Sequence, residues 1–109
     1  MEILGIQGGL WRTTSVSETP EIVLRRWTIR ELDNGDRHFV GYNVTEGEGR
    51  VSSKIVEFDP KTMRGKTRSG RVYQLDGESS INTDAEYVWN GWCAMYRIES
   101  WKDVSEEAC

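Results

Sequence analysis

Basic side chains are concentrated between residues 50 and 71, and they are the residues in this sequence best suited to binding chemistry. This segment holds seven Lys and Arg residues against two acids, whereas five basic residues stand against eight acids before it and two against eight after it. A local field steers partners more than the net charge of -4 does, so the block is the first candidate for a contact surface. The expected partner-binding residues are Lys61, Arg64, Lys66, Arg68 and Arg71.

This basic block is compatible with three interpretations. The simplest is a solvated hairpin that binds nothing. Nucleic-acid binding is another, because basic side chains neutralise phosphates and Tyr73 could stack on a base; the acidic net charge and a core position for Tyr73 oppose it. Contact with a protein is the third, and it also suits the five Trp residues, since Trp, Tyr and Arg dominate interface energetics.

The remaining reactive residues form no catalytic or metal-binding pattern. His38 is the single His, and the two Cys residues, Cys93 and Cys109, stand at no ligand spacing, so we expect no metal and no cofactor. Cys93 falls among core positions of a helical pattern, where a thiol is shielded from reaction, while Cys109 is expected to be exposed. The sequence therefore favours a protein that is not an enzyme.

Length and composition predict one soluble domain over residues 1–109. A chain of this size can bury a modest core without disulfides, and its hydrophobic fraction of 37% is ordinary for a globular protein. Glu2 stands where a signal peptide would be basic, and no apolar run reaches the roughly 18 residues that a membrane span needs. We therefore expect a cytoplasmic protein with no membrane contact.

The elements that position the basic block are predicted to be strands joined by hairpin turns over residues 1–76. A glycine-broken strand over 1–12 and a polar loop over 13–20 precede strands over 21–32 and 37–44. Asn34-Gly35 between these strands is the strongest short hairpin signal, and we take it as a two-residue loop. In that register the facing pairs are Ile29 with Val40, Trp27 with Tyr42, and Glu31 with His38.

A further strand over 50–58 and two turns lead into the basic hairpin. The strand changes phase between Ile55 and Val56, which indicates a bulge or burial on both faces, and residues 59–62 fit a type I turn. For the hairpin itself, a three-residue loop over 68–70 with Gly70 in the left-handed region separates charge from apolar bulk better than a two-residue loop does. It pairs Gly65 with Tyr73 and Met63 with Leu75, and places Arg64 and Lys66 on the opposite face.

A single helix over 83–96 is predicted after the sheet. Thr83 and Glu86 fit a capping box, and apolar residues recur at helical spacing, at Ala85, Val88, Trp89, Trp92, Cys93, Met95 and Tyr96. Residues 97–109 are expected to form a short strand around residues 98–101 and a frayed acidic tail. The predicted fold is α+β: an antiparallel meander of five or six strands with the C-terminal helix packed across one face.

The residues TRSGRVYQLDG and DAEYVWNGW, between Thr67 and Trp92, resemble a motif of small bacteriophage and prophage proteins whose activities are uncharacterised. The resemblance covers about a quarter of the chain and implies a phage-like origin and a role in adjusting host proteins. On this basis we expect a small non-enzymatic protein that occupies a host protein or complex, as an anti-defence or anti-CRISPR-like inhibitor does. A nucleic-acid binder using residues 61–71, a virion or assembly accessory protein, and a homodimer are the alternatives.

Overall fold

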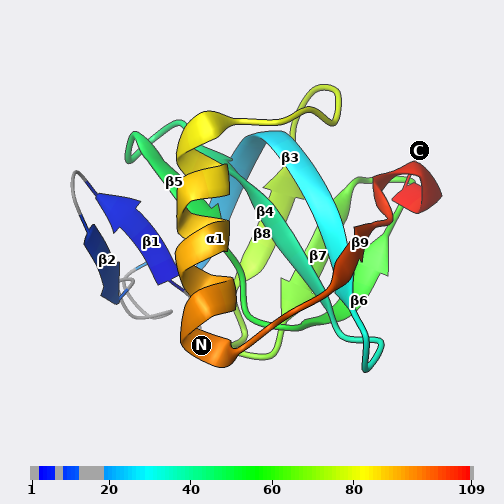
Figure 1. Cartoon of the computed structure of the whole chain (residues 1–109). Coiled ribbons are helices and arrows are strands. Elements are labelled where there is room, and N and C mark those ends of the chain that lie inside the picture. The colour runs from blue at the N-terminus through cyan, green and yellow to red at the C-terminus, as the bar shows by residue number, and fades with distance from the viewer. Residues whose placement is uncertain (1–2, 7–8, 13–18, 109) are drawn as a thin grey trace.

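The computed structural model describes residues 3–6, 9–12 and 19–108. Within these ranges the chain forms nine strands, one α-helix and one 3-10 helix (Figure 1). Most of the loop predicted over 13–20, and Cys109, lie outside the described residues. The elements in chain order are β1 (Ile3–Ile6), β2 (Gly9–Arg12), β3 (Glu21–Leu32), β4 (Arg37–Asn43), β5 (Glu48–Val51), β6 (Ile55–Asp59), β7 (Arg64–Thr67), β8 (Val72–Leu75), α1 (Thr83–Tyr96), β9 (Trp101–Asp103) and η1 (Ser105–Ala108).

All the strands that are described belong to one sheet, in the order β2-β1-β5-β4-β3-β8-β7-β6, with β9 added beside β3. The predicted α+β class, the mainly antiparallel sheet and the single helix are confirmed. The sheet has more strands than the five or six predicted, because residues 3–6 and 9–12 form two paired strands, β1 and β2, and residues 48–59 are divided into β5 and β6. It is also not a simple meander, since β3 and β8 are parallel neighbours.

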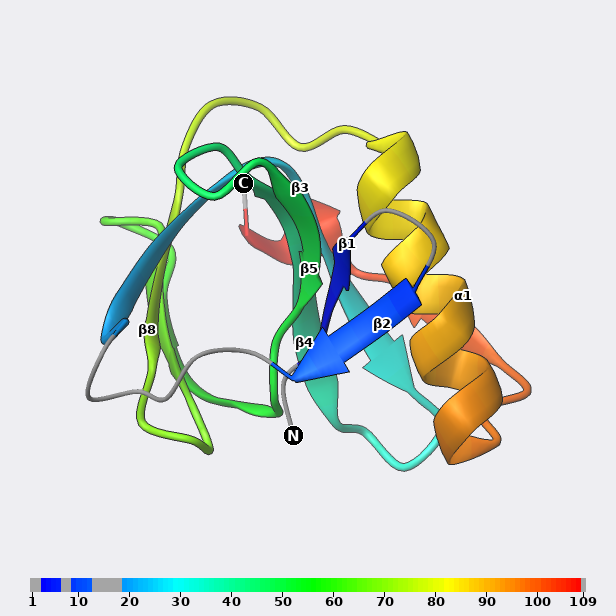
Figure 2. The ribbon, with the colours of Figure 1, turned by 90° about the vertical axis from the view of Figure 1, so that its left-hand side faces the viewer.

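The sheet curls, and each of its faces covers a separate group of buried side chains (Figure 2). One group fills the inside of the curl and includes Leu24, Phe39 and Tyr73, none of which is measurably exposed. The other lies between the sheet and α1 and includes Val51 and Trp89. The helix therefore covers the outer face of β4 and β5, while the curl of β3, β8, β7 and β6 encloses its own core.

A bulge in β3 allows this long strand to take part in both halves of the sheet. Its pairing with β4 shifts between Arg25 and Thr28, and Arg26 adopts a positive φ of 47°. The bulge turns the Trp27 indole into the core, where its Nε1 donates to the Gly77 carbonyl at 3.0 Å. The part of β3 before the bulge pairs with β8, and the part after the bulge pairs with β9. This twelve-residue strand therefore has two different neighbours along its length.

The turn between β3 and β4 differs from the predicted two-residue loop. The Leu32 amide donates to the Asp36 carbonyl at 2.8 Å, which closes a three-residue loop with Gly35 at φ 92°. One extra loop residue moves the register by one position, so the predicted facing pairs are wrong. The observed pairs are Ile29 with Phe39, Arg30 with His38, and Glu31 with Arg37, while Tyr42 faces Arg25 and Trp27 lies in the bulge.

The turn and the bulge predicted around β6 are present. The Lys61 amide donates to the Asp59 carboxylate at 2.9 Å, as expected of an Asp that begins a turn. The loop is one residue longer than predicted, because the Met63 amide bonds the Asp59 carbonyl and Met63 takes a φ of 58°. The pairing of β6 with β7 shifts between Ile55 and Glu57, which confirms a bulge at the predicted change of phase.

The helix α1 has the predicted bounds but a different cap and a narrower buried stripe. Asn82 is the N-cap, and its side-chain oxygen accepts from the Ala85 amide at 2.9 Å, so the predicted Thr83 cap is one residue too late. Glu86 does not complete a capping box but forms an ion pair with Arg30. Met95 and Tyr96 are 54% and 40% exposed, because the helix rests on the sheet along its other side. The buried positions are Ala85, Val88, Trp89 and Trp92.

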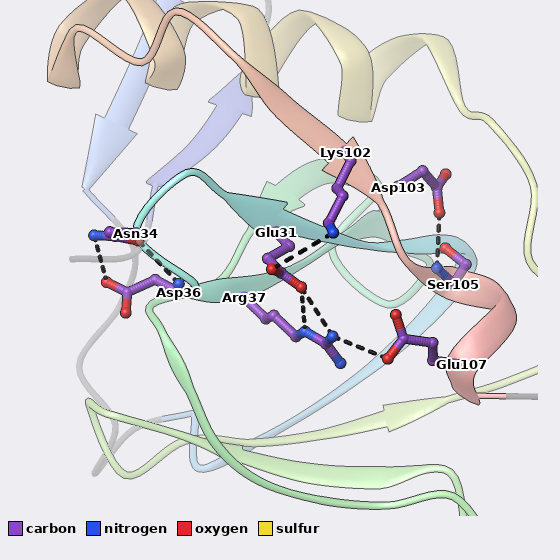
Figure 3. A network of polar contacts seen from close by, with 8 residues as sticks. All are labelled: Glu31, Asn34, Asp36, Arg37, Lys102, Asp103, Ser105 and Glu107. Carbon is purple, nitrogen blue, oxygen red and sulfur yellow. Dashed lines mark hydrogen bonds and ion pairs between the residues drawn. The ribbon is translucent and has the colours of Figure 1, made fainter.

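The C-terminal segment is attached to the sheet rather than frayed. A short strand is present as β9, but it covers residues 101–103 and so begins later than the predicted 98–101. Val104 and Ala108 beyond it are buried in the core inside the curl. Figure 3 shows how Arg37 connects the sheet to this segment, with its Nη2 2.8 Å from Glu31 and 2.9 Å from Glu107. The expectation of a frayed acidic tail is therefore wrong for residues 101–108.

Candidate partner-binding surface

The basic hairpin β7–β8 has the predicted three-residue loop. The Thr67 amide donates to the Arg71 carbonyl at 3.0 Å, and Gly70 takes a φ of 94°. Gly65 faces Tyr73, and the Leu75 amide donates to the Met63 carbonyl, as predicted. Gly65 has a second role, because a Cβ at this position would lie 2.5 Å from the ring of Phe39. The register, and with it the outward direction of Arg64 and Lys66, is confirmed.

Four of the five predicted contact residues are exposed. Arg64 and Lys66 point away from the core, as predicted, and Lys61 and Arg68 lie in the loops at the two ends of β7. Arg71 differs from them, because it is only 1% exposed and its Nε donates to the Thr19 carbonyl at 2.8 Å. Since this guanidinium bonds the backbone before β3, we leave Arg71 out of the candidate surface.

Acidic residues lie among these basic side chains, which the linear sequence did not show. Glu57 is the cross-strand partner of Lys66 and Asp59 is that of Arg64, and directly paired residues share a face. Glu21 comes from the parallel neighbour β3, on the other side of β8. We call this set of residues the outer hairpin face: Glu21, Glu57, Asp59, Arg64 and Lys66.

A two-pronged ion pair orders part of the outer hairpin face. Arg64 donates through Nη1 and Nη2 to the two carboxylate oxygens of Glu21, at 2.7 and 2.9 Å. These hydrogen bonds lower the pKa of Glu21, and the pair ties β7 to β3 across β8. Both side chains are more than 40% exposed, so the pair fixes geometry more than it stabilises the fold.

An open groove of about 300 Å³ runs across this face. Val72 supplies apolar surface to it, and Glu57, Asp59, Arg64 and Lys66 are among its lining residues. Phe58 also lines it, but its ring packs in the core inside the curl, 5.8 Å from that of Phe39. Lys66 and Arg68 form no ion pair with any residue in the described part of the chain, which leaves both charges available for an external group. The full lining is Glu57, Phe58, Asp59, Thr62, Arg64, Gly65, Lys66 and Val72.

Arg30 and Arg50 are also buried, and sequence patterns did not indicate the side chains that they contact. Arg30 is 1% exposed, and its guanidinium lies against two indole rings, 5.2 Å from the Trp89 centroid and 4.5 Å from that of Trp101. Arg50 is also 1% exposed and contacts the Tyr73 hydroxyl at 3.0 Å and Glu48 at 3.2 Å. Both guanidinium groups are therefore part of the fold, and a surface built on a count of basic residues would wrongly include them.

Groups that could support catalysis or hold a metal do not converge. Within residues 3–6, 9–12 and 19–108, no three His, Cys, Asp or Glu side chains come together as a metal site requires. Cys93 is partly buried and burial raises the pKa of its thiol, which disfavours the reactive thiolate. The acid and base side chains of the outer hairpin face are exposed, and Arg64 and Glu21 among them form an ion pair.

His38 is buried rather than paired with Glu31 at the surface. It is 5% exposed, its Nδ1 lies 2.9 Å from the Ser52 carbonyl, and its ring lies 4.7 Å from that of Trp92. The change follows from the register of β3 and β4, which places His38 opposite Arg30. Burial lowers the pKa of His38, and this outweighs the opposing effects of the Ser52 carbonyl and of Asp36.

The lowered pKa of His38 makes stability depend on pH. Below a pH of about 6.5 the unfolded chain binds a proton on His38 while the folded chain leaves it neutral, so acidification favours unfolding. We expect the free energy of unfolding, measured by urea denaturation, to fall as pH decreases through about 6.5 toward the lowered folded value. The decrease in the free energy of unfolding should be smaller for the His38→Gln variant, because Gln does not titrate. An equal fall in both proteins would show that other groups cause it.

No helix in the described part of the chain has the length and apolar character needed to cross a membrane. Comparison with known proteins gives no relative: no family model matches the chain, and no curated protein or solved structure is significantly similar to it. The arrangement of the outer hairpin face is therefore the basis for a functional proposal.

Proposed function

We propose that this chain is a small non-enzymatic binding protein that acts by occupying a protein partner through its outer hairpin face and the adjoining Lys61 and Arg68. The motif resemblance suggests a phage or prophage origin, and hence a host protein or complex as the target. Defence complexes are the kind of target that such an inhibitor would occupy.

The observation that carries this proposal is the alternation of charge on the outer hairpin face. Three carboxylates, from Glu21, Glu57 and Asp59, stand beside Arg64 and Lys66. A nucleic-acid backbone presents only negative charge and would meet repulsion from these acids, whereas a protein surface can match both signs. The apolar surface of Val72, which lies opposite Lys66 in the same groove, adds to the suitability for a protein partner.

Charge reversal on this face should remove binding. We expect Lys66→Glu/Arg68→Glu to lose most of the partner captured from host lysate, because both charges are exposed and neither holds the fold together. The matched control is Arg25→Glu/Lys102→Glu, which changes the charge equally at side chains that are 62% and 71% exposed elsewhere. Quantitative pull-down followed by mass spectrometry measures the difference.

The same variants separate protein binding from nucleic-acid binding. If the captured material were nuclease-sensitive, and its capture fell steeply with added salt, the residues would be contacting phosphates and the proposal would fail. Equal loss in the test and control variants would mean that net charge alone governs capture. Unchanged capture in Lys66→Glu/Arg68→Glu would remove this face from consideration.

A further inference from the structure

Five exposed residues of α1 and its C-cap lie along one line on the side turned away from the sheet. They are spaced alternately four and three residues apart, which is the spacing of a helix-pairing seam. The buried stripe that includes Trp89 lies on the opposite side of the helix, and Figures 1 and 2 show α1 as the outermost layer of the molecule. We call this line the helix seam: Thr83, Tyr87, Asn90, Ala94 and Arg97.

The helix seam has an unusual composition for a solvent-facing helix. Residues 83–96 contain no Lys or Arg, and their two acids are Asp84 and Glu86, of which Glu86 is bound to the buried Arg30. A helix that only faces water usually carries charges along its exposed side. Here Tyr87 is 53% exposed and the small Ala94 lies about two turns further along the helix, so the seam offers one large ring and one small side chain. Tyr is enriched at interfaces, so this surface suits contact better than solvation.

The helix seam is complementary to itself when two copies run antiparallel. In a pair whose twofold axis passes between Asn90 and Gly91, residues at equal distances before and after that point lie level with each other. Tyr87 of one copy then lies over Ala94 of the other, so a large side chain meets a small one. The two Asn90 amides lie next to the axis, one on each side of it, and each offers a donor and an acceptor. At both ends, the exposed Asp84 comes level with the exposed Arg97 of the second copy, so opposite charges meet.

We infer that the helix seam binds a second copy of this chain in an antiparallel, twofold-symmetric pair. Two chains of net charge -4 repel each other, and the seam lets them approach along an uncharged centre with opposite charges at each end. A symmetric pair buries the same patch on both copies, as the relation of Tyr87 to Ala94 requires. One fourteen-residue helix covers less than the roughly 800 Å² per partner of a standard interface, so the pair is weak and concentration-dependent.

Sedimentation velocity of the full chain over increasing protein concentration tests this inference. We expect the weight-average mass to rise from monomer toward dimer for the wild-type protein. Asn90→Arg should remain monomeric, because it places two like charges at the centre of the pair. Its monomer should fold at least as well as the wild type, since Arg has a higher helix propensity than Asn, and far-UV circular dichroism checks this.

Met95→Arg is the matched control. It adds the same charge to the same helix at a side chain that is 54% exposed but lies off the helix seam, so dimerisation should persist. A wild-type chain that stays monomeric at every concentration would overturn the inference. So would a dimer that Asn90→Arg and Met95→Arg weaken equally, or a wild-type monomer whose seam captures a different protein.

Discussion

Trp89→Ala is expected to destabilise the protein by about 3–5 kcal/mol, the range for removal of a buried Trp. Trp89 is fully buried. Its ring stacks on that of Trp92 with the centroids 5.2 Å apart, and it forms an edge-to-face contact with Trp101 with the centroids 5.3 Å apart. Its loss opens a cavity between α1 and the sheet and also removes one of the two rings that hold the buried Arg30. The midpoint of chemical denaturation, followed by circular dichroism, measures the effect.

Met95→Ala is the comparison for this variant, because it truncates a large side chain on the same helix that is 54% exposed. We expect it to change stability by less than about 0.5 kcal/mol, as is usual at the surface. Since domains of this size are stable by only about 5–15 kcal/mol, Trp89→Ala should lie close to the limit of folding. A loss for Trp89→Ala as small as that for Met95→Ala would contradict the packing described between α1 and the sheet.

Gly49→Ala is expected to have the second-largest effect, through overpacking rather than a cavity. A Cβ at Gly49 would lie 2.4 Å from the carbonyl carbon and oxygen of Asp84 and 2.6 Å from the Ala85 nitrogen. These are backbone atoms in the first turn of α1, and they cannot rotate away as the end of a side chain could. Overpacking costs typically about 1–3 kcal/mol, and we expect the upper end because the start of the helix must move away from β5.

Gly77→Ala is the control for the glycine variant. Gly77 has a φ of 73°, and a Cβ at this position would have no atom within 4 Å, so the added methyl group causes backbone strain without a clash. That strain costs about 1–2 kcal/mol. In thermal denaturation, the melting temperature of Gly49→Ala should therefore be lower than that of Gly77→Ala. The reverse order would mean that α1 does not approach β5 as closely as described.

Local turn chemistry predicted the register of the β7–β8 hairpin correctly and that of the β3–β4 hairpin wrongly. Gly70 follows Arg68-Ser69, and only the three-residue loop kept Arg64 and Lys66 away from the core, so the pattern had one consistent solution. Asn34-Gly35 fits both a two-residue and a three-residue loop, and both registers pair apolar residues. Nothing in the local sequence distinguishes them, and the wrong choice also placed His38 at the surface.

Long-range contacts account for what the sequence did not show at the candidate surface. The carboxylate that holds Arg64 belongs to Glu21, which is brought near by the parallel pairing of β3 with β8. Arg71 is buried because the backbone at Thr19 passes beside the hairpin. Such pairings join segments about 50 residues apart and leave no periodic signal, so a count of basic residues suggested a basic surface where the fold builds a mixed one.

A photo-crosslinking residue placed at Lys66, and separately at Lys102, most directly tests whether the outer hairpin face binds a protein. After irradiation in host lysate, we expect position 66 to yield a discrete crosslinked product that is destroyed by protease and unaffected by nuclease. Position 102, whose side chain is 71% exposed on strand β9 and does not line the groove, should yield none. A nuclease-sensitive product at position 66, or the same protein product at both positions, would contradict the proposed function.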